Sequence, residues 1–122
     1  ENLKIDNFSV MPGSELKLLK GLELGCDGII TATCNVTAGL SREVYDDFIE
    51  KKVQTKNEML CDVRNTFEKF NLISGLHSFM SDEDKIYKNV LPPVSILNEK
   101  DKLLLTEQLN KLNFTLGSLK AA

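Results

Sequence analysis

The sequence predicts an α/β fold that forms the closing section of a larger parallel sheet or barrel. In the first half, two short β-prone runs at residues 8–11 and 28–33 alternate with helical patterns, and the second half is helical. Two strands joined by one helix form a parallel pair, which by itself leaves both sheet edges open. We therefore expect the rest of the sheet to lie outside this sequence.

The first predicted strand, residues 8–11, ends at a Pro-Gly turn signal. Ser14 suits the N-cap of the following helix, because its hydroxyl can accept a hydrogen bond from the first helical turn. Leucines at roughly helical spacing follow from Glu15, and Gly25 stands where a C-terminal cap is expected.

The second predicted strand, residues 28–33, is a β-branched run with little alternation, typical of a strand buried on both faces. Asn35 and Gly39 interrupt the run, so the next helix is expected over residues 41–51. An alternative remains open, in which the chain is a non-enzymatic helical interaction domain and residues 28–33 are a buried helix segment.

The remaining chain is expected to be mostly helical. It consists of a helix over residues 59–70, a short helix at 74–80, a polar loop or weak helix at 81–88, an extended connector at 91–94 and a final amphipathic helix capped by Asn98. The predicted organisation is two strand–helix units at 1–52, followed by a helical region at 53–122.

The composition is that of an average soluble domain. The chain has 122 residues, 42% of them hydrophobic and 27% charged, with a formal net charge of −3. No apolar run can span a bilayer and neither charge sign clusters, so we expect no membrane and no nucleic acid among its partners. Three cysteines without a CxxC motif predict reduced thiols in a cytoplasmic protein.

The candidate site lies where the two predicted strands end, because a parallel barrel carries its active site at the C-terminal ends of its strands. This places residues 12–15 and 31–35 at the site. Gly13 lets a ligand approach the backbone, and the N–H groups of Ser14 and Glu15 open a helix that favours carboxylates and phosphates. A plain turn and cap explain the same residues without any ligand.

Other candidate groups are weaker. His77 is the only histidine and has no assignable nucleophile, while Cys34 reads as a small buried thiol. The acidic pair at 46–47 and the acidic run at 82–84 lack the spacing of a calcium loop, so neither metal nor organic cofactor is expected. A self-sufficient enzyme using His77 or Cys34 is a third hypothesis.

Three segments together resemble the closing part of the dihydrodipicolinate synthase and N-acetylneuraminate lyase family. They are Pro12-Gly13-Ser14-Glu15, Gly25-Cys26-Asp27-Gly28-Ile29-Ile30 and Thr33-Cys34-Asn35-Val36. In that family a turn glycine with a following acidic residue ends strand seven, and a G-x-(D/H)-G-x-I segment forms strand eight. The resemblance covers about residues 8–113 and implies strands seven and eight of a (β/α)8 TIM barrel plus the C-terminal helices.

The resemblance also implies a class I aldolase or lyase. A lysine on strand six forms a Schiff base with pyruvate, and the resulting enamine adds to an aldehyde, or the reverse cleavage releases it. That lysine would fall upstream of Glu1, because no lysine here lies inside either predicted strand or just past its C-terminal end. This chain alone is therefore expected to be inactive. The implied partners are pyruvate, an aldehyde or 2-keto acid, the missing N-terminal part of the barrel, and further copies in a homo-oligomer.

By the same resemblance, the carbonyl of Ile30 lies near the Schiff-base lysine, and Gly13 and Glu15 face the second substrate. The expected substrate-binding residues are Gly13, Ser14, Glu15, Ile30 and Ala32. Sialic-acid lyases carry an acidic residue where Leu16 stands and a serine at Ala32, which argues against N-acetylneuraminate. Dihydrodipicolinate synthase and 2-keto-3-deoxy sugar acid aldolase both remain open.

Overall fold

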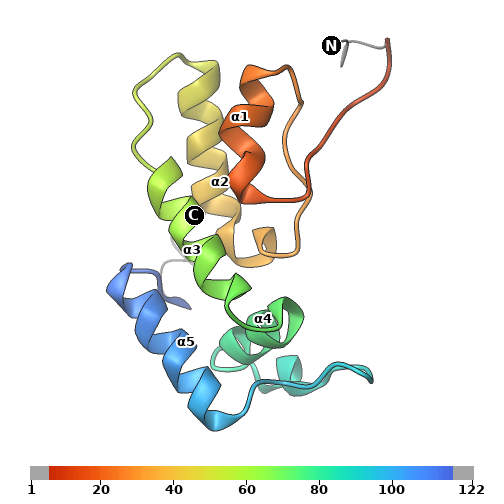
Figure 1. Ribbon diagram of the computed structural model, residues 1–122, viewed down its shortest axis with the longest axis vertical. Helices are drawn as coiled ribbons and strands as arrows, with labels where there is room; N and C mark the ends of the chain where they lie inside the picture. The colour runs from red at the N-terminus through yellow and green to blue at the C-terminus, as the bar shows by residue number, and fades with distance from the viewer. Residues whose placement is uncertain (1–5, 117–122) are drawn as a thin grey trace. The chain divides into compact units, whose positions relative to one another are not determined.

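The computed structural model describes residues 6–116, which fold into helices joined by turns and irregular segments (Figure 1). The helical elements are η1 (Glu15–Lys17), α1 (Leu18–Glu23), α2 (Cys34–Ile49), α3 (Asn57–Glu68), α4 (Leu72–Met80), η2 (Lys85–Lys88) and α5 (Glu99–Lys111). The chain divides into two compact units, Glu1–Cys61 and Asp62–Ala122, called here the first and the second unit.

Both strand predictions, at residues 8–11 and 28–33, were wrong: no strand forms among residues 6–116. The two segments still exchange backbone hydrogen bonds, from Asp27 N–H to Val10 O (3.1 Å) and from Ile30 N–H to Pro12 O (3.2 Å). The register shifts by one residue between these bonds, so they do not form the evenly spaced ladder of a parallel pair. Parallel strands are stable within a larger sheet that is covered on both faces, and residues 6–116 contain no such sheet.

The alternative of a buried helix at residues 28–33 was also wrong. Residues 28–31 have no regular secondary structure, and the side chain of Ile30 is 72% exposed. The first helical residue after this segment is Cys34, where α2 begins. The apolar run therefore forms neither of the two structures expected of it.

Helix α2 begins seven residues before the predicted start at Ser41 and ends at Ile49. Asn35 and Gly39 were expected to interrupt the apolar run ahead of the helix, but both lie inside α2, and a glycine inside a helix costs only about 1 kcal/mol relative to alanine. Burial of Val36 and Val44, which are 2% and 0% exposed, offsets that cost. The tertiary packing of this helix therefore outweighs its local sequence signal.

The core of the first unit lies where α1 packs along α2 (Figure 1). Leu18 and Leu22 of α1 meet Val44 of α2 and Leu60 of α3, and all four are buried. Five partly buried side chains surround them: Leu19, Ile29, Leu40, Tyr45 and Phe48. This small aliphatic core fixes α1 and the segments on either side of it.

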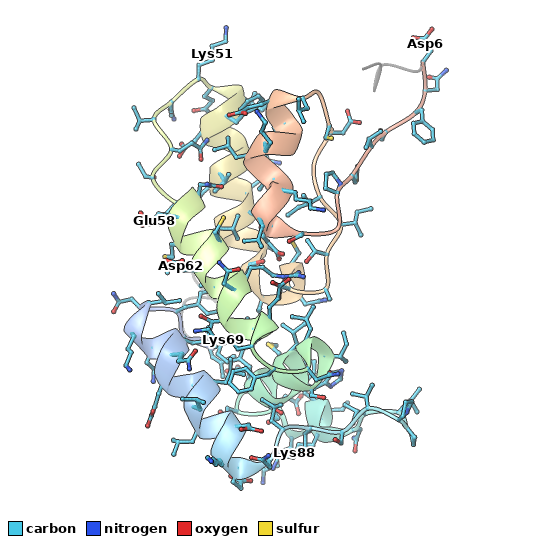
Figure 2. The ribbon with its side chains drawn as sticks, viewed as in Figure 1. Asp6, Lys51, Glu58, Asp62, Lys69 and Lys88 are labelled. Atoms are coloured by element: carbon cyan, nitrogen blue, oxygen red, sulfur yellow. The ribbon has the colours of Figure 1, made fainter. Side chains whose placement is uncertain are left out.

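Three helices end in the same left-handed cap. The predicted cap at Gly25 is confirmed: its φ is 91°, and Cys26 N–H bonds to Gly21 O at 2.9 Å, as in a Schellman motif. Lys51 after α2 and Asn113 after α5 take the same conformation, each with φ of 55°. The side chain of Lys51 points away from the ribbon (Figure 2).

The second unit has an aromatic core. Phe67 and Phe79 meet edge to face with ring centroids 5.7 Å apart, and Phe79 stacks on Phe114 at 5.8 Å. The predicted N-cap at Asn98 is confirmed, because its Oδ1 accepts the N–H of Asp101 at 2.9 Å. The predicted extended connector at 91–94 is instead a turn, in which Val94 N–H bonds to Leu91 O at 3.0 Å and the Pro92–Pro93 bond is cis.

Candidate functional site

The structure brings together the two segments that the sequence assigned to the site, residues 12–15 and 31–35, through a hydrogen bond from Thr31 to Glu15. Ile30, directly before the second segment, also contacts the first. Ile30 N–H donates to Pro12 O at 3.2 Å. A Cβ atom placed on Gly13 would lie 3.8 Å from the carbonyl oxygen of Ile30, so the two backbones run close together at this point. The two segments therefore lie side by side as expected, although neither of them is a strand.

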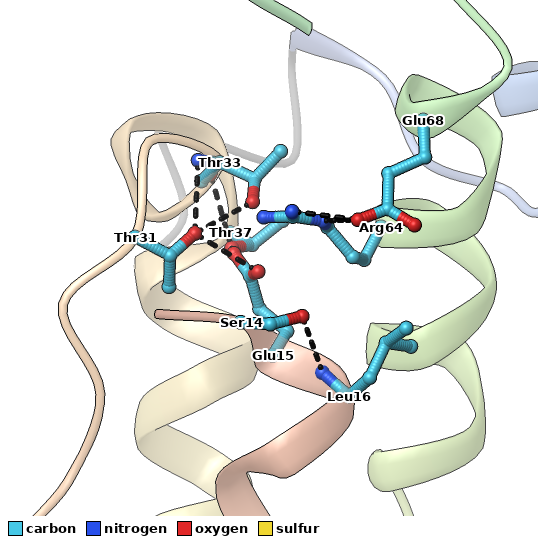
Figure 3. Close-up of polar contacts among 8 residues, drawn as sticks. All are labelled: Ser14, Glu15, Leu16, Thr31, Thr33, Thr37, Arg64 and Glu68. Carbon is cyan, nitrogen blue, oxygen red and sulfur yellow. Dashed lines mark hydrogen bonds and ion pairs between the residues drawn. The ribbon is translucent and has the colours of Figure 1, made fainter. Parts of the chain in front are cut away.

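Ser14 caps the helical turn that follows it, as predicted. Its Oγ accepts a hydrogen bond from Leu16 N–H at 3.4 Å, and its backbone is extended. The 3-10 turn η1 leads directly into the six residues of α1. The chain reversal before η1 places Glu15 at the start of this turn, with its side chain directed inward (Figure 3).

Glu15 carries a buried carboxylate whose two oxygens both accept hydrogen bonds from threonines (Figure 3). Oε1 accepts from Thr37 Oγ1 at 2.9 Å, and Oε2 accepts from Thr31 Oγ1 at 3.0 Å. The side chain of Glu15 is 0% exposed. A buried carboxylate is tolerated only when polar partners of this kind replace its water.

Thr33 extends this network. Its hydroxyl lies 2.8 Å from that of Thr31, and its backbone N–H donates to Thr31 Oγ1 at 3.2 Å. Either hydroxyl can be the donor of this bond, and Thr33 also forms a hydrogen bond with the Glu15 carboxylate. Thr33 is itself buried, so the cluster is held inside the first unit.

The pKa of Glu15 lies below its ordinary value. Burial alone would raise the pKa, but hydrogen bonds from Thr33, from its own backbone N–H, from Thr37 and from Thr31 outweigh it. The carboxylate is therefore ionised at neutral pH. An ionised acceptor also makes each of these hydrogen bonds stronger than one between neutral groups.

Cys34 stands at the first position of α2, beside this cluster. Its Sγ lies 3.6 Å from Ser41 Oγ. Burial raises the pKa of the Cys34 thiol and outweighs the hydrogen bond with Ser41, which lowers it; the negative charge of Glu15 adds a smaller upward shift. A thiol with a raised pKa is a poor nucleophile, which disfavours the hypothesis of a cysteine enzyme.

The remaining predicted contacts, Ile30 and Ala32, differ in exposure. The side chain of Ile30 is 72% exposed, whereas Ala32 is half-buried. The Ala32 carbonyl accepts hydrogen bonds from the Asn35 side chain at 2.8 Å and from its backbone N–H at 3.2 Å. Asn35 thus closes the turn that leads from Ile30 into α2.

The other charged candidates have structural partners. In the second unit, His77 Nδ1 donates to the carbonyl of Tyr87 at 2.7 Å, and Asp82 pairs with Lys102. In the first unit, Asp46 pairs with Arg42 on α2 at 2.8 Å. Residues 6–116 contain no group of three or more His, Cys, Asp or Glu side chains placed to hold a metal ion.

An open groove of about 640 Å³ in the second unit was not anticipated from the sequence. The N-cap residues of α4 and α5, Asn71 and Asn98, line it together with Lys69 and Gln108. Lys69 Nζ donates to Gln108 Oε1 at 2.9 Å, and both asparagines cap their own helices. These polar groups already have partners, so the groove presents no evident catalytic arrangement.

Comparison with known proteins identifies the family. The family model of the dihydrodipicolinate synthetase family matches residues 2–112. The chain belongs to this family. No curated protein matches the sequence.

Three solved structures share the fold. Dihydrodipicolinate synthase DapA-2 from Bacillus anthracis superposes with a TM-score of 0.76 at 19% identity over 88% of this chain, and the enzyme from Agrobacterium tumefaciens with 0.72 at 18% over 87%. YagE, a prophage protein of the dihydrodipicolinic acid synthase family from E. coli K12 solved in complex with pyruvate, gives 0.67 at 22% over 88%. The match spans 38%, 36% and 38% of those chains respectively, so this chain corresponds to a little over a third of their length.

Among residues 6–116, no helix is long and apolar enough to cross a membrane. The sequence predicted that residues 12–15 and 31–35 lie together, and the contact of Thr31 with Glu15 falls within these ranges. It missed Thr37, which contacts Glu15 across 22 positions in the chain. The only signal for it was the recurrence of threonines at 31, 33 and 37 after the apolar run.

Proposed function

We propose that this chain is the C-terminal part of a class I aldolase or lyase that makes or cleaves a carbon–carbon bond to pyruvate. In this proposal residues 8–11 and 28–33, which form no regular strand in the described chain, occupy the positions of the last two strands of a TIM barrel. The chain also supplies the C-terminal helices. The catalytic Schiff-base lysine belongs to the part of the protein upstream of Glu1. Alone, this chain does not catalyse the reaction.

The observation that carries the proposal is the close approach of residues 12–15 to residues 30–33. The family resemblance assigns these two segments to the substrate site, and Ile30 N–H bonds to Pro12 O between them. Family membership over residues 2–112 supports the reaction class. The pyruvate complex of YagE, a protein similar to this chain, supports pyruvate as a substrate.

In the proposed mechanism, the lysine amine attacks the ketone of pyruvate, water leaves, and a protonated imine forms. Loss of a proton from the methyl group gives an enamine, which adds to the carbonyl carbon of an aldehyde. The Ile30 carbonyl lies beside the imine, and the turn at Gly13 and Ser14 together with Ala32 borders the second substrate. We also propose a cytoplasmic location and a homo-oligomer, as expected from the sequence and the family resemblance.

The substrate is tested on the full-length protein that carries this chain. Pyruvate is supplied with aspartate semialdehyde to detect condensation, and 2-keto-3-deoxy sugar acids are supplied to detect pyruvate release. Turnover in either assay supports the proposal and identifies the branch of the family. If the purified, folded protein turns over neither class and forms no imine with pyruvate, the proposed function is wrong.

A further inference from the structure

We propose that Glu15 is a positioning residue, whose carboxylate holds the backbone of residues 30–33 through Thr31 and Thr37 and does not touch the second substrate. This inference rests on the proposed function. It replaces the substrate contact that the family resemblance implies for Glu15 with a role one step removed from the reacting atoms.

The carboxylate of Glu15 is buried and has hydrogen-bond partners within the protein. Glu15 is 0% exposed, and its oxygens lie 2.9 Å from the hydroxyl of Thr37 and 3.0 Å from that of Thr31. A substrate contact requires a polar atom that faces the site. The carboxylate of Glu15 instead points into the first unit, while the side chain of Ile30 is 72% exposed.

Thr31 connects the Glu15 carboxylate to the backbone of the turn. Its hydroxyl donates to Glu15 and accepts the backbone N–H of Thr33 at 3.2 Å, so the side chain ties two parts of the turn to the carboxylate. The nitrogen of Thr31 and the carbonyl of Ile30 belong to one planar peptide unit. A shift of Thr31 therefore moves the Ile30 carbonyl, the group placed beside the Schiff-base lysine.

Thr37 connects the same network to helix α2. Thr37 is 1% exposed, and its Oγ1 lies 2.9 Å from Glu15 Oε1 and 3.1 Å from the carbonyl oxygen of Thr33. One hydroxyl hydrogen is thus shared between the carboxylate and the turn. This contact links residues 31–33 to a helix of 16 residues, which is a rigid support.

The charge of Glu15 strengthens all of these contacts. The hydrogen bonds hold its pKa below the ordinary value even though burial opposes this, so the threonine hydroxyls bond to an ionised acceptor. Glutamine at this position keeps the size but replaces one acceptor oxygen with an NH₂ donor, which faces a hydroxyl that also donates. The arrangement consequently depends on the carboxylate and not only on its volume.

The test compares three variants in the full-length protein: Glu15→Gln, Thr37→Val and the conservative Thr37→Ser. Thr37 is buried, so an effect of its replacement cannot come from a lost substrate contact. The readouts are the rate of imine formation with pyruvate, followed by borohydride trapping, and the KM of the second substrate. The pH profile of the rate is recorded for each variant.

We expect Glu15→Gln and Thr37→Val each to slow imine formation by about tenfold, which corresponds to about 1.4 kcal/mol, while the KM of the second substrate changes less than about twofold. Their double variant should be little slower than either single one, because both break the same network. Thr37→Ser should restore the rate to within about twofold of the original.

The opposite pattern would overturn the inference: a KM of the second substrate raised about tenfold by Glu15→Gln and left unchanged by Thr37→Val. If the original protein forms no pyruvate adduct, the proposed function fails. Amide hydrogen exchange at Thr33 then decides the positioning role separately. Exchange about tenfold faster in both Glu15→Gln and Thr37→Val supports that role, and unchanged exchange contradicts it.

Discussion

The two units differ in the kind of side chains that they bury. The first unit surrounds one carboxylate with three threonine hydroxyls beside a small aliphatic core, whereas the second unit is held by stacked and edge-to-face aromatic rings. A buried polar network is stable only when every polar group in it has a hydrogen-bond partner, and such a network holds its side chains in a single arrangement. The comparison teaches that the part of the chain assigned to the substrate site is specified by hydrogen bonds, and the helical region by apolar packing.

The largest effect is expected from Phe67→Ala in the second unit. Phe67 is 0% exposed and contacts Phe79, so its truncation leaves a cavity and lowers the free energy of unfolding by about 3–5 kcal/mol. Leu103→Ala on α5, where Leu103 is 61% exposed, is the matched control and should change stability by less than about 0.5 kcal/mol. Amide exchange in α4 and α5 measures both. Equal effects would mean that the aromatic core does not hold this unit.

A smaller loss is expected from Thr37→Val in the first unit. Valine keeps the volume but leaves Glu15 Oε1 without this donor, which costs about 1–3 kcal/mol. Thr55→Val, at an exposed threonine of the same unit, serves as the control and should be nearly neutral. Exchange of the α2 amides measures the difference. A neutral Thr37→Val would show that the network contributes nothing to stability.

Acid should weaken the first unit through Glu15. Its pKa is lower in the folded state than the ordinary value of 4.5, so ionisation stabilises the fold above pH 4.5. This contribution is lost as the pH falls from about 4.5 through the lower folded pKa. Glu15→Gln should reduce the pH dependence of α2 amide protection in this range. An unchanged pH profile would mean that other carboxylates cause it.

The smallest effects are expected at the helix ends. Lys51 occupies a left-handed position that glycine adopts without a Cβ penalty, so Lys51→Gly should stabilise the first unit by about 1 kcal/mol. Gly25→Ala, at the equivalent position after α1, should destabilise it by about the same amount. Denaturation midpoints of the two variants measure this pair. Shifts of the same sign would contradict the assignment of the two caps.

Local signals predicted the helices and caps well, because Ser14, Gly25 and Asn98 act through neighbours in the chain. The strands could not be predicted with the same success. Residues 28–33 carry β-branched side chains, but a strand also needs partners that the described residues do not provide. The helix start at Cys34 was missed because burial of Val36 outweighs the local interruption.

The candidate site was predicted in part. The position of Glu15 after the turn glycine followed from its pattern, yet its burial did not, because the orientation of a side chain depends on what folds against it. Thr37 lies 22 positions away and meets Glu15 only after α2 packs on α1. No short motif encodes a contact at that separation.

The most direct test of the central claim is borohydride trapping of the full-length protein with pyruvate, followed by peptide mass mapping. The account predicts one reduced pyruvate adduct, on a lysine upstream of Glu1, and none on the lysines of this chain. An adduct on a lysine within residues 1–122 would contradict the assignment of the site. The absence of any adduct on folded protein would contradict the Schiff-base mechanism itself.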